Sequence, residues 1–399
     1  MPVCRLLRPS LLPSSVRQYF TGHCYKPLIK FRGMATQKSD LVITERQGKV
    51  GTICLNKPKA LNALNGEMIQ AMYSIVKEWD DDDDVQLIIV KGAGEKAFCA
   101  GGDVRAITEA GKIGDPLTIN FFKEEYTLNF TTGTLRTPYV CLLDGITMGG
   151  GVGISVHGLF RVTTEKTVFA MPETAIGFFP DVGGSYFLPR LQGSLGMFLA
   201  LTGCRLKSRD VYHAGIGTHF ITSDKLPELS SSLMRLSTYN LDAVKDVIDT
   251  YHRESLGSHD SPFALQDHLP IINECFSKGS VEEIVSSLET HDSEWAKQQA
   301  KILAKMSPTS MKVTHRQLLE GARLSFADCF QMEYRMSQGF VAGKDFYEGV
   351  RAVLVDRDNS PKWDPPTLQQ VTDKDMDEYF KPLGDNDLQL SGLLYSAKL

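Results

Sequence analysis

The chain has 399 residues, with 43 Lys and Arg against 48 Asp and Glu, so its formal net charge at pH 7 is −5. Its hydrophobic share of 42% and charged share of 23% are ordinary for a globular protein, and no apolar run approaches the roughly 20 residues of a membrane span. These properties exclude an integral membrane protein, and the acidic balance makes non-specific binding to nucleic acid unfavourable.

The first 39 residues contain seven basic residues and no Asp or Glu, with Ser, Leu and Arg interleaved from Leu6 to Arg17. This composition predicts a mitochondrial transit peptide over residues 1–33 and a location in the matrix, with a disordered basic arm as the alternative. Cleavage after Arg32 would remove six positive charges and no negative one, taking the formal charge from −5 to −11. The last residues, Ala397-Lys398-Leu399, differ at one position from the peroxisomal Ser-Lys-Leu signal, but a match so short arises easily by chance.

From residue 40 the chain alternates between strand and helix patterns. Val50–Leu55 and Leu87–Val90 are predicted strands, and Asn65 is the expected N-cap of the helix between them. The pattern then repeats, with strands predicted over Tyr139–Leu143 and Phe160–Thr163 and a helix that starts in the intervening glycine run.

Beyond about Arg190 the strand-like alternation stops and helical patterns continue to about Leu354. Two apolar helix faces are expected, one with Ile302, Leu303 and Met306, and one with Leu318, Leu319, Ala322 and Leu324. We therefore expect an α/β core over residues 40–230, a C-terminal helical region over 231–355 and a Pro-containing acidic tail over 356–399.

The eight cysteines are scattered without a C-x-x-C pair, and the nine histidines show no metal-ligand spacing. The pattern favours a reducing compartment and argues against a disulfide framework or a zinc site. We predict no metal and no resident cofactor.

The chemistry suggested by the residues lies in two glycine turns and a pair of acids. Gly149-Gly150-Gly151 and Gly101-Gly102 offer backbone N–H groups that a substrate can approach closely, as an oxyanion site requires. Glu173 and Asp181 are eight residues apart, and a carboxylate there can act as base, acid or nucleophile. Together they provide the groups needed to polarise and attack a carbonyl.

Three motifs, over residues 56–64, 97–103 and 145–151, resemble in order and spacing the crotonase (enoyl-CoA hydratase/isomerase) superfamily. The resemblance covers roughly residues 40–230 and implies a crotonase-like spiral of repeated ββα units followed by the C-terminal helical region. It also implies an acyl-CoA substrate, with the thioester oxygen held between the N–H groups of Gly102 and Gly150. CoA would then be part of the substrate and not a cofactor.

The acids distinguish between the reactions of the superfamily. Hydratases have a catalytic glutamate where this chain has Gly153, and they have glycine where it has Asp181, whereas Glu173 is shared. Together with residues 171–184 and 360–365, the Glu173/Asp181 pair resembles the hydrolase branch, which implies hydrolysis of a short, branched 3-hydroxyacyl-CoA in valine breakdown. The alternative is an enoyl-CoA hydratase or isomerase.

The resemblance assigns Glu173 and Asp181 as catalytic and Glu125 as a substrate contact alongside Gly150. Glu173 would either activate water or attack the acyl carbon, and Asp181 would orient the water or the substrate hydroxyl. Lys57 and Lys59 are candidates for binding the CoA phosphates, with solubilising surface lysines as the equal alternative.

Two other classes of protein compete with this interpretation. A serine hydrolase would need a G-x-S-x-G turn, but the stretch around Ser155 ends in His157 where the second glycine is required. An inactive acyl-CoA-binding or RNA-binding relative is disfavoured because Glu173 and Asp181 are both present. The sequence does not indicate whether the chain forms a homo-oligomer.

Overall fold

The computed structural model describes residues 39–258 and 261–390. The predicted transit peptide and the Ala397–Leu399 signal lie outside these residues. Within them, no helix combines the length and apolar character needed to cross a bilayer.

Ten strands form two sheets in the described chain. The larger sheet has the order β1-β2-β3-β5-β7-β10 and is parallel except for β1, which pairs antiparallel with β2. Its strands are β1 Val42–Gln47, β2 Val50–Leu55, β3 Leu87–Gly92, β5 Tyr139–Leu143, β7 Phe160–Thr163 and β10 His219–Phe220. The smaller sheet has the order β4-β6-β8-β9, with β9 antiparallel to β8. Its strands are β4 Ala97–Cys99, β6 Ile146–Met148, β8 Val168–Ala170 and β9 Leu206–Lys207.

From β3 to β8, successive strands enter the two sheets alternately, which produces the predicted spiral of ββα units. β3 joins the large sheet and β4 the small one, and the helices α2 (Val104–Lys112) and α3 (Leu117–Gly133) follow. β5, β6 and α4 (Gly150–Val156) form the next unit. β7 and β8 lead into the short helix η3 (Glu173–Ile176). Each unit therefore delivers the end of a small-sheet strand and the start of a helix to the same region.

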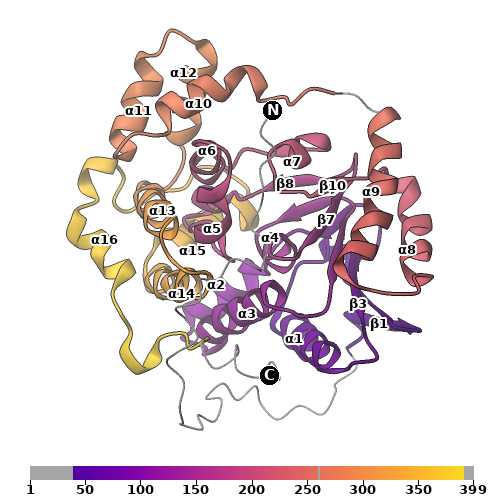
Figure 1. The fold of residues 1–399 in the computed structure, drawn as a ribbon. Helices are drawn as coiled ribbons and strands as arrows, with labels where there is room; N and C mark the ends of the chain where they lie inside the picture. Colours follow the sequence, from indigo (N-terminus) through magenta and orange to yellow (C-terminus); the bar gives the residue numbers. More distant parts are fainter. Residues whose placement is uncertain (1–38, 259–260, 391–399) are drawn as a thin grey trace, which may run out of the picture.

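The predicted elements of the core are confirmed. Asn65 caps α1 (Gly66–Asp81) by accepting a hydrogen bond from the backbone nitrogen of Met68. The large sheet is covered on one face by α8 (Leu226–Met234) and α9 (Leu241–Ser258), which lie at the edge of the molecule in Figure 1. Its other face belongs to the main core, with α1, α3 and α4.

Helices α3 and α4 lie close together through three glycines spaced along them. A Cβ added to Gly150 would overlap Oε1 of Glu125, and a Cβ on Gly153 would lie 2.7 Å from Oδ1 of Asn129. One turn further, a Cβ on Gly133 would lie 3.0 Å from Cβ of His157. These approaches fix the register of α3, and so the position of Glu125, against the start of α4.

The C-terminal half is helical, as predicted, and lies beside the end of the spiral (Figure 1). Its larger helices are α10 Leu269–Cys275, α11 Val281–Thr290, α12 Glu294–Leu303, α13 Pro308–Gly321, α14 Phe326–Ala342, α15 Asp345–Val350 and α16 Asp373–Phe380. The prediction that strands end near Arg190 was wrong, because β9 and β10 follow. Both have only two residues, too few to give an alternating pattern. The apolar face proposed around Leu318 was wrong for Leu319, whose side chain is 53% exposed, and for Ala322, which is also exposed.

Candidate active site

The first glycine turn lies between β4 and α2. Leu64 forms an isolated parallel bridge with Gly102, in which Leu64 N donates to Gly101 O and Asp103 N donates to Leu64 O. The bridge uses backbone groups of residues 101 and 103, so the N–H of Gly102 stays outside the pairing. Asp103 then starts α2, and its side chain accepts a hydrogen bond from Ala106 N.

The second glycine turn joins β6 to α4. Gly149 has φ 44°, a left-handed conformation that glycine adopts readily. Gly150 is the first residue of α4, so its N–H has no acceptor within the helix and lies at the positive end of the helix dipole. A Cβ on Gly150 would lie 3.3 Å from the nitrogen of Gly102. The two turns predicted to form an oxyanion site are therefore adjacent.

Three carboxyl groups surround these turns. Glu173 opens η3, and its Oε1 lies 3.1 Å from the position of a Cβ on Gly149. Glu125 contacts Gly150 from α3, and Asp181 follows the loop after η3. Glu125, Glu173 and Asp181 are only 2%, 6% and 6% exposed. Within the described residues, Oε1 of Glu125 and Oε2 of Glu173 have no hydrogen-bond partner, so both have a free acceptor atom.

Burial shifts the pKa of each of these acids upward, because a charged carboxylate loses solvation there. It raises the pKa of Asp181 to about 7, although the hydrogen bond from Tyr126 opposes the shift. The pKa values of Glu173 and Glu125 are also raised well above the usual range, by desolvation first and then by the nearby charge of Asp181. With its pKa near 7, Asp181 can exchange a proton near neutral pH.

The space beyond Gly153 is already filled. A Cβ at this position would lie 2.6 Å from Cβ of Val182 and 2.7 Å from Oδ1 of Asn129. The side chain that a hydratase has here therefore has no room in this chain. Asn129 is itself fully buried, and neither of its side-chain polar atoms has a partner among the described residues.

The predicted lysines differ in their surroundings. Lys57 Nζ lies 3.2 Å from Oδ2 of Asp103, beside the turn that carries Gly102. Lys59 lies in a short 3₁₀ turn and is exposed. The ion pair with Asp103 places Lys57 next to the Gly102 turn.

Ser155 and His157 do not form a catalytic pair. The Ser155 hydroxyl donates to the helix carbonyls of Gly151 and Val152, at 2.8 and 3.1 Å. His157 Nε2 is hydrogen-bonded to Val182 O at 2.8 Å. Both side chains are used within the fold, as the sequence indicated.

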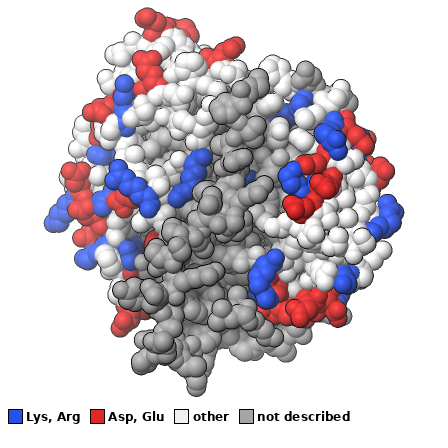
Figure 2. Space-filling model, in the orientation of Figure 1, with Lys and Arg blue, Asp and Glu red and all other residues white. Residues whose placement is uncertain are grey.

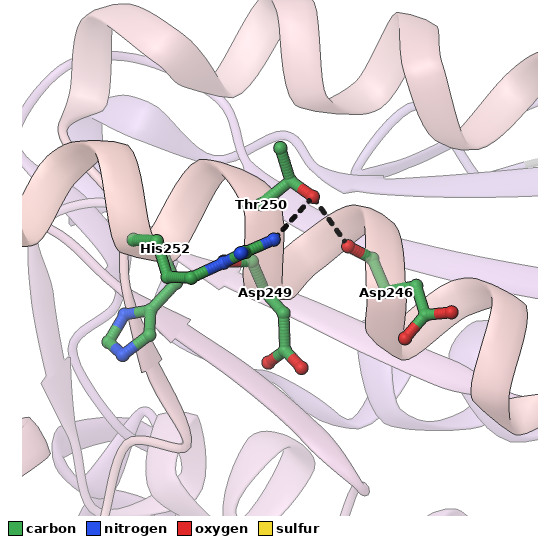
Figure 3. Close-up of a pocket in the computed structure, with 5 residues that line it drawn as sticks. Asp246, Asp249, Thr250 and His252 are labelled. Carbon is green, nitrogen blue, oxygen red and sulfur yellow. Dashed lines mark hydrogen bonds between the residues drawn. The ribbon is translucent and has the colours of Figure 1, made fainter.

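A separate hollow of about 510 Å³ lies on α9, lined by Asp246, Asp249, Thr250, His252 and Arg253 (Figure 3). Its acid Asp249 contacts His219 at 3.0 Å and also pairs with Lys245. Thr250 donates to the helix carbonyl of Asp246. Asp249, Thr250 and His252 are thus hydrogen-bonded to neighbouring groups of the protein, on the face of the large sheet opposite the main core.

Two residues near the site were not predicted. Tyr126 donates a 2.9 Å hydrogen bond to Oδ2 of Asp181, and Glu333 on α14 binds the loop that follows Asp181. Tyr126 directly follows Glu125 in sequence, so its proximity could have been inferred. Glu333 lies between Met332 and Tyr334 on α14. The only indication in the sequence was an acidic residue among apolar ones in a predicted helix.

Comparison with known proteins identifies the family. The model for "Enoyl-CoA hydratase/isomerase" matches residues 50–380. The chain belongs to the enoyl-CoA hydratase/isomerase family. This confirms the resemblance stated from the three sequence motifs and covers the C-terminal helices as well as the spiral core.

Within this family, similar curated proteins share one name, "3-hydroxyisobutyryl-CoA hydrolase, mitochondrial". The protein of Gallus gallus is 57% identical over 88% of this chain and 91% of its own length. The protein of Danio rerio is 54% identical over 96% of this chain and 100% of its own length. The protein of Homo sapiens is 54% identical over 89% of this chain and 92% of its own length.

Solved structures of the family confirm the crotonase-like fold. A carnitinyl-CoA dehydratase from Mycobacterium thermoresistibile aligns with a TM-score of 0.81 and 36% identity, over 89% of this chain and all of that one. An enoyl-CoA hydratase from Rhodobacter sphaeroides aligns with a TM-score of 0.78 and 31% identity, over 88% of this chain and all of that one. Both matches extend through most of the C-terminal helical region.

Proposed function

We propose that this protein hydrolyses the thioester of 3-hydroxyisobutyryl-CoA, releasing the hydroxy acid and free CoA. The relatives that carry this name are 54–57% identical to it over nearly their full lengths. The observation that carries the proposal is the pairing of Glu173 with Asp181 beside two backbone donors, in a site with no room for a side chain at Gly153. A hydratase needs a catalytic glutamate at that position, in addition to the one that corresponds to Glu173.

In the proposed mechanism, the thioester oxygen accepts hydrogen bonds from the N–H groups of Gly102 and Gly150. These donors stabilise the negative charge that develops on the oxygen as the carbonyl carbon becomes tetrahedral, and one such donor typically contributes about 3–4 kcal/mol. Glu173 lies next to Gly149, and one of its oxygens has no hydrogen-bond partner in the described part of the chain. It is placed to act on the carbon that these donors polarise.

Glu173 acts as the central carboxylate, by one of two routes. As a general base it takes a proton from water, whose oxygen bonds to the acyl carbon; as a nucleophile it bonds to that carbon itself, and water then cleaves the anhydride. In both routes the bond between carbon and sulfur breaks, and the CoA sulfur leaves with the electron pair and is protonated. The products are one carboxylic acid and one thiol for each water consumed.

Asp181, ionised by loss of its proton near pH 7, would orient the water or the substrate's 3-hydroxyl and hold Glu173 in place. Glu125 would contact the substrate next to Gly150. Basic and acidic side chains are interspersed on the described surface visible in Figure 2, so binding of the polyanionic CoA would depend on local cations. Lys57, beside the Gly102 turn, is placed for this role.

The names of the relatives place those proteins in mitochondria, and we extend this location to the present chain. The basic, acid-free residues 1–33 support the assignment. The substrate is an intermediate of valine breakdown, which implies a role in branched-chain amino acid catabolism.

A panel of short acyl-CoA esters tests the function. Each ester, with or without a 3-hydroxyl, is incubated with the purified protein, and released thiol is read with a thiol-reactive dye. We expect the highest kcat/KM for 3-hydroxyisobutyryl-CoA. A parallel assay follows the ultraviolet absorbance of a short enoyl-CoA. Loss of that absorbance without thiol release would instead support the hydratase alternative.

A further inference from the structure

The loop over Pro180–Ser185, here named the Asp181 loop, has a backbone that needs external support. Val182 has φ 52° and Gly183 has φ 88°, and a non-glycine residue in the left-handed region costs of order 1 kcal/mol or more. Such a conformation persists only where the surrounding structure holds it. The loop carries the acid that distinguishes this chain from the hydratase pattern.

Two buried side chains of the C-terminal helices bind this loop. Gln317 on α13 donates to Pro180 O at 2.7 Å and to Ser185 Oγ at 3.1 Å. Glu333 on α14 accepts hydrogen bonds from Gly183 N at 2.7 Å, from Ser185 N at 2.8 Å and from the Ser185 hydroxyl. Both Gln317 and Glu333 are completely buried.

Within the spiral core, two further contacts complete the support. His157 Nε2 binds Val182 O at 2.8 Å, and Tyr126 donates to the Asp181 carboxyl itself. Burial lowers the pKa of His157 to about 4, so its ring is neutral at physiological pH and donates from Nε2. Pro180, Asp181, Val182, Gly183 and Ser185 of the loop are thus all bound by a side chain outside the loop.

Burying a carboxyl group at position 333 is costly unless its hydrogen bonds are specific. Burial raises the pKa of Glu333 to about 8, and its three donors oppose that shift. All three of its hydrogen bonds lead to the Asp181 loop, and none of its partners among the described residues is a cation. An apolar side chain would cost less here if packing were the only requirement.

We propose that Glu333, assisted by Gln317, is a positioning residue that sets the backbone of the Asp181 loop so that the Asp181 carboxyl faces the reacting thioester. The C-terminal helices then contribute to catalysis although neither side chain touches the substrate. This inference rests on the proposed hydrolase function and on the role of Asp181 in it. Misplacing a catalytic group by about 1 Å can cost about 10²-fold in rate.

A double-mutant cycle between positions 333 and 181 tests the proposal. In Glu333→Gln the amide nitrogen meets one of the N–H donors of the loop, so a hydrogen bond to Gly183 or Ser185 is lost. We expect kcat for 3-hydroxyisobutyryl-CoA to fall by about 10–100-fold with KM changed less. In an Asp181→Asn background the same substitution should lower kcat by less than about twofold, because the group being positioned is gone.

Two further variants keep the test decisive. Ser185→Ala retains both backbone donors to Glu333 and removes the hydroxyl, with its hydrogen bonds to Glu333 and from Gln317. It should lower kcat by a smaller factor than Glu333→Gln does, and it remains informative if Glu333→Gln folds poorly. Ser337→Ala, one turn along α14, removes a buried hydroxyl that donates to Tyr334 O and should leave kcat near wild type.

The outcomes separate the inference from the function on which it rests. Equal losses from Glu333→Gln with and without Asp181 would show a general structural effect and overturn the positioning role. An unchanged kcat in Glu333→Gln or Ser185→Ala would also overturn it. Near-normal activity of Asp181→Asn alone would instead refute the proposed site.

Discussion

The hydroxyl of Tyr126 donates a 2.9 Å hydrogen bond to Oδ2 of Asp181, and both residues are buried. Tyr126 lies on α3 directly after Glu125, so one turn of one helix supplies both a free carboxyl oxygen and the donor that favours the ionised form of another acid. Burial raises the pKa of Asp181, and a residue outside the sequence motifs partly opposes that shift.

Tyr126→Phe should move the pH dependence of catalysis upward. The lost hydrogen bond favours the ionised form of Asp181, so its removal raises the pKa further above about 7. Since the proposed mechanism uses the carboxylate, the ascending limb of kcat/KM should shift to higher pH by roughly half to one unit, as expected for a hydrogen bond worth roughly 1 kcal/mol. Profiles measured from pH 5.5 to 9 check this. A limb that is unmoved or shifted downward would contradict the assignment.

Asp181→Asn should stabilise the protein increasingly as pH rises. The pKa of Asp181 is about 7 in the folded protein, above its usual value of 3.8. Because the folded state holds this proton more tightly than the unfolded state, the wild type has its full free energy of unfolding below about pH 4 and loses part of it as the pH rises through 7. Asn does not ionise, so the variant does not lose this stability, and at pH 8 its free energy of unfolding should exceed that of the wild type by up to about 4 kcal/mol. Guanidinium unfolding of both proteins at pH 5 and pH 8 measures this difference in the free energy of unfolding. A gain that is equal at both values would refute the raised pKa.

The sequence predicted the core of the site because its signals are local. Asn65 precedes an apolar helix face, and Glu173 and Asp181 lie in recognisable stretches around glycine turns. The contacts of Glu333 join residues about 150 positions apart, and no local pattern encodes them. Leu319 was wrongly predicted to be buried, because the spacing of apolar residues along a helix does not show which side of the helix other elements cover. The catalytic roles and the domain boundaries at residues 230 and 355 remain predictions.

Gly150→Ala should remove most activity by distorting the oxyanion site. The added Cβ would overlap Glu125 Oε1 and lie 3.2 Å from Leu64 Cδ1 and 3.3 Å from Gly102 N, so it crowds the Gly102 donor and displaces either the Glu125 carboxyl or the start of α4. We expect kcat to fall by about 10²–10³-fold, the usual effect of losing one oxyanion donor. Gly257→Ala on α9 is the matched control, because nothing lies within 4 Å of its Cβ position. Comparable activity of the two variants would rule out this geometry.

Gly153→Glu should not restore a hydratase. Val182 and Asn129 occupy the position of the new Cβ, so the substitution should destabilise the fold and lower thiol release without giving hydration of an enoyl-CoA. Ultraviolet absorbance of the enoyl-CoA and thiol release, measured on the same preparation, check both reactions. Appearance of hydratase activity in this single variant would mean that the space is available after all.

The most direct test of the account is the rate of thiol release from 3-hydroxyisobutyryl-CoA by Glu173→Gln. This variant keeps the shape of the side chain and removes its ability to act as base or nucleophile, while its circular dichroism spectrum should match wild type. We predict a fall in kcat of at least about 10²–10⁴-fold. A folded variant with kcat within tenfold of wild type would contradict the central role of Glu173.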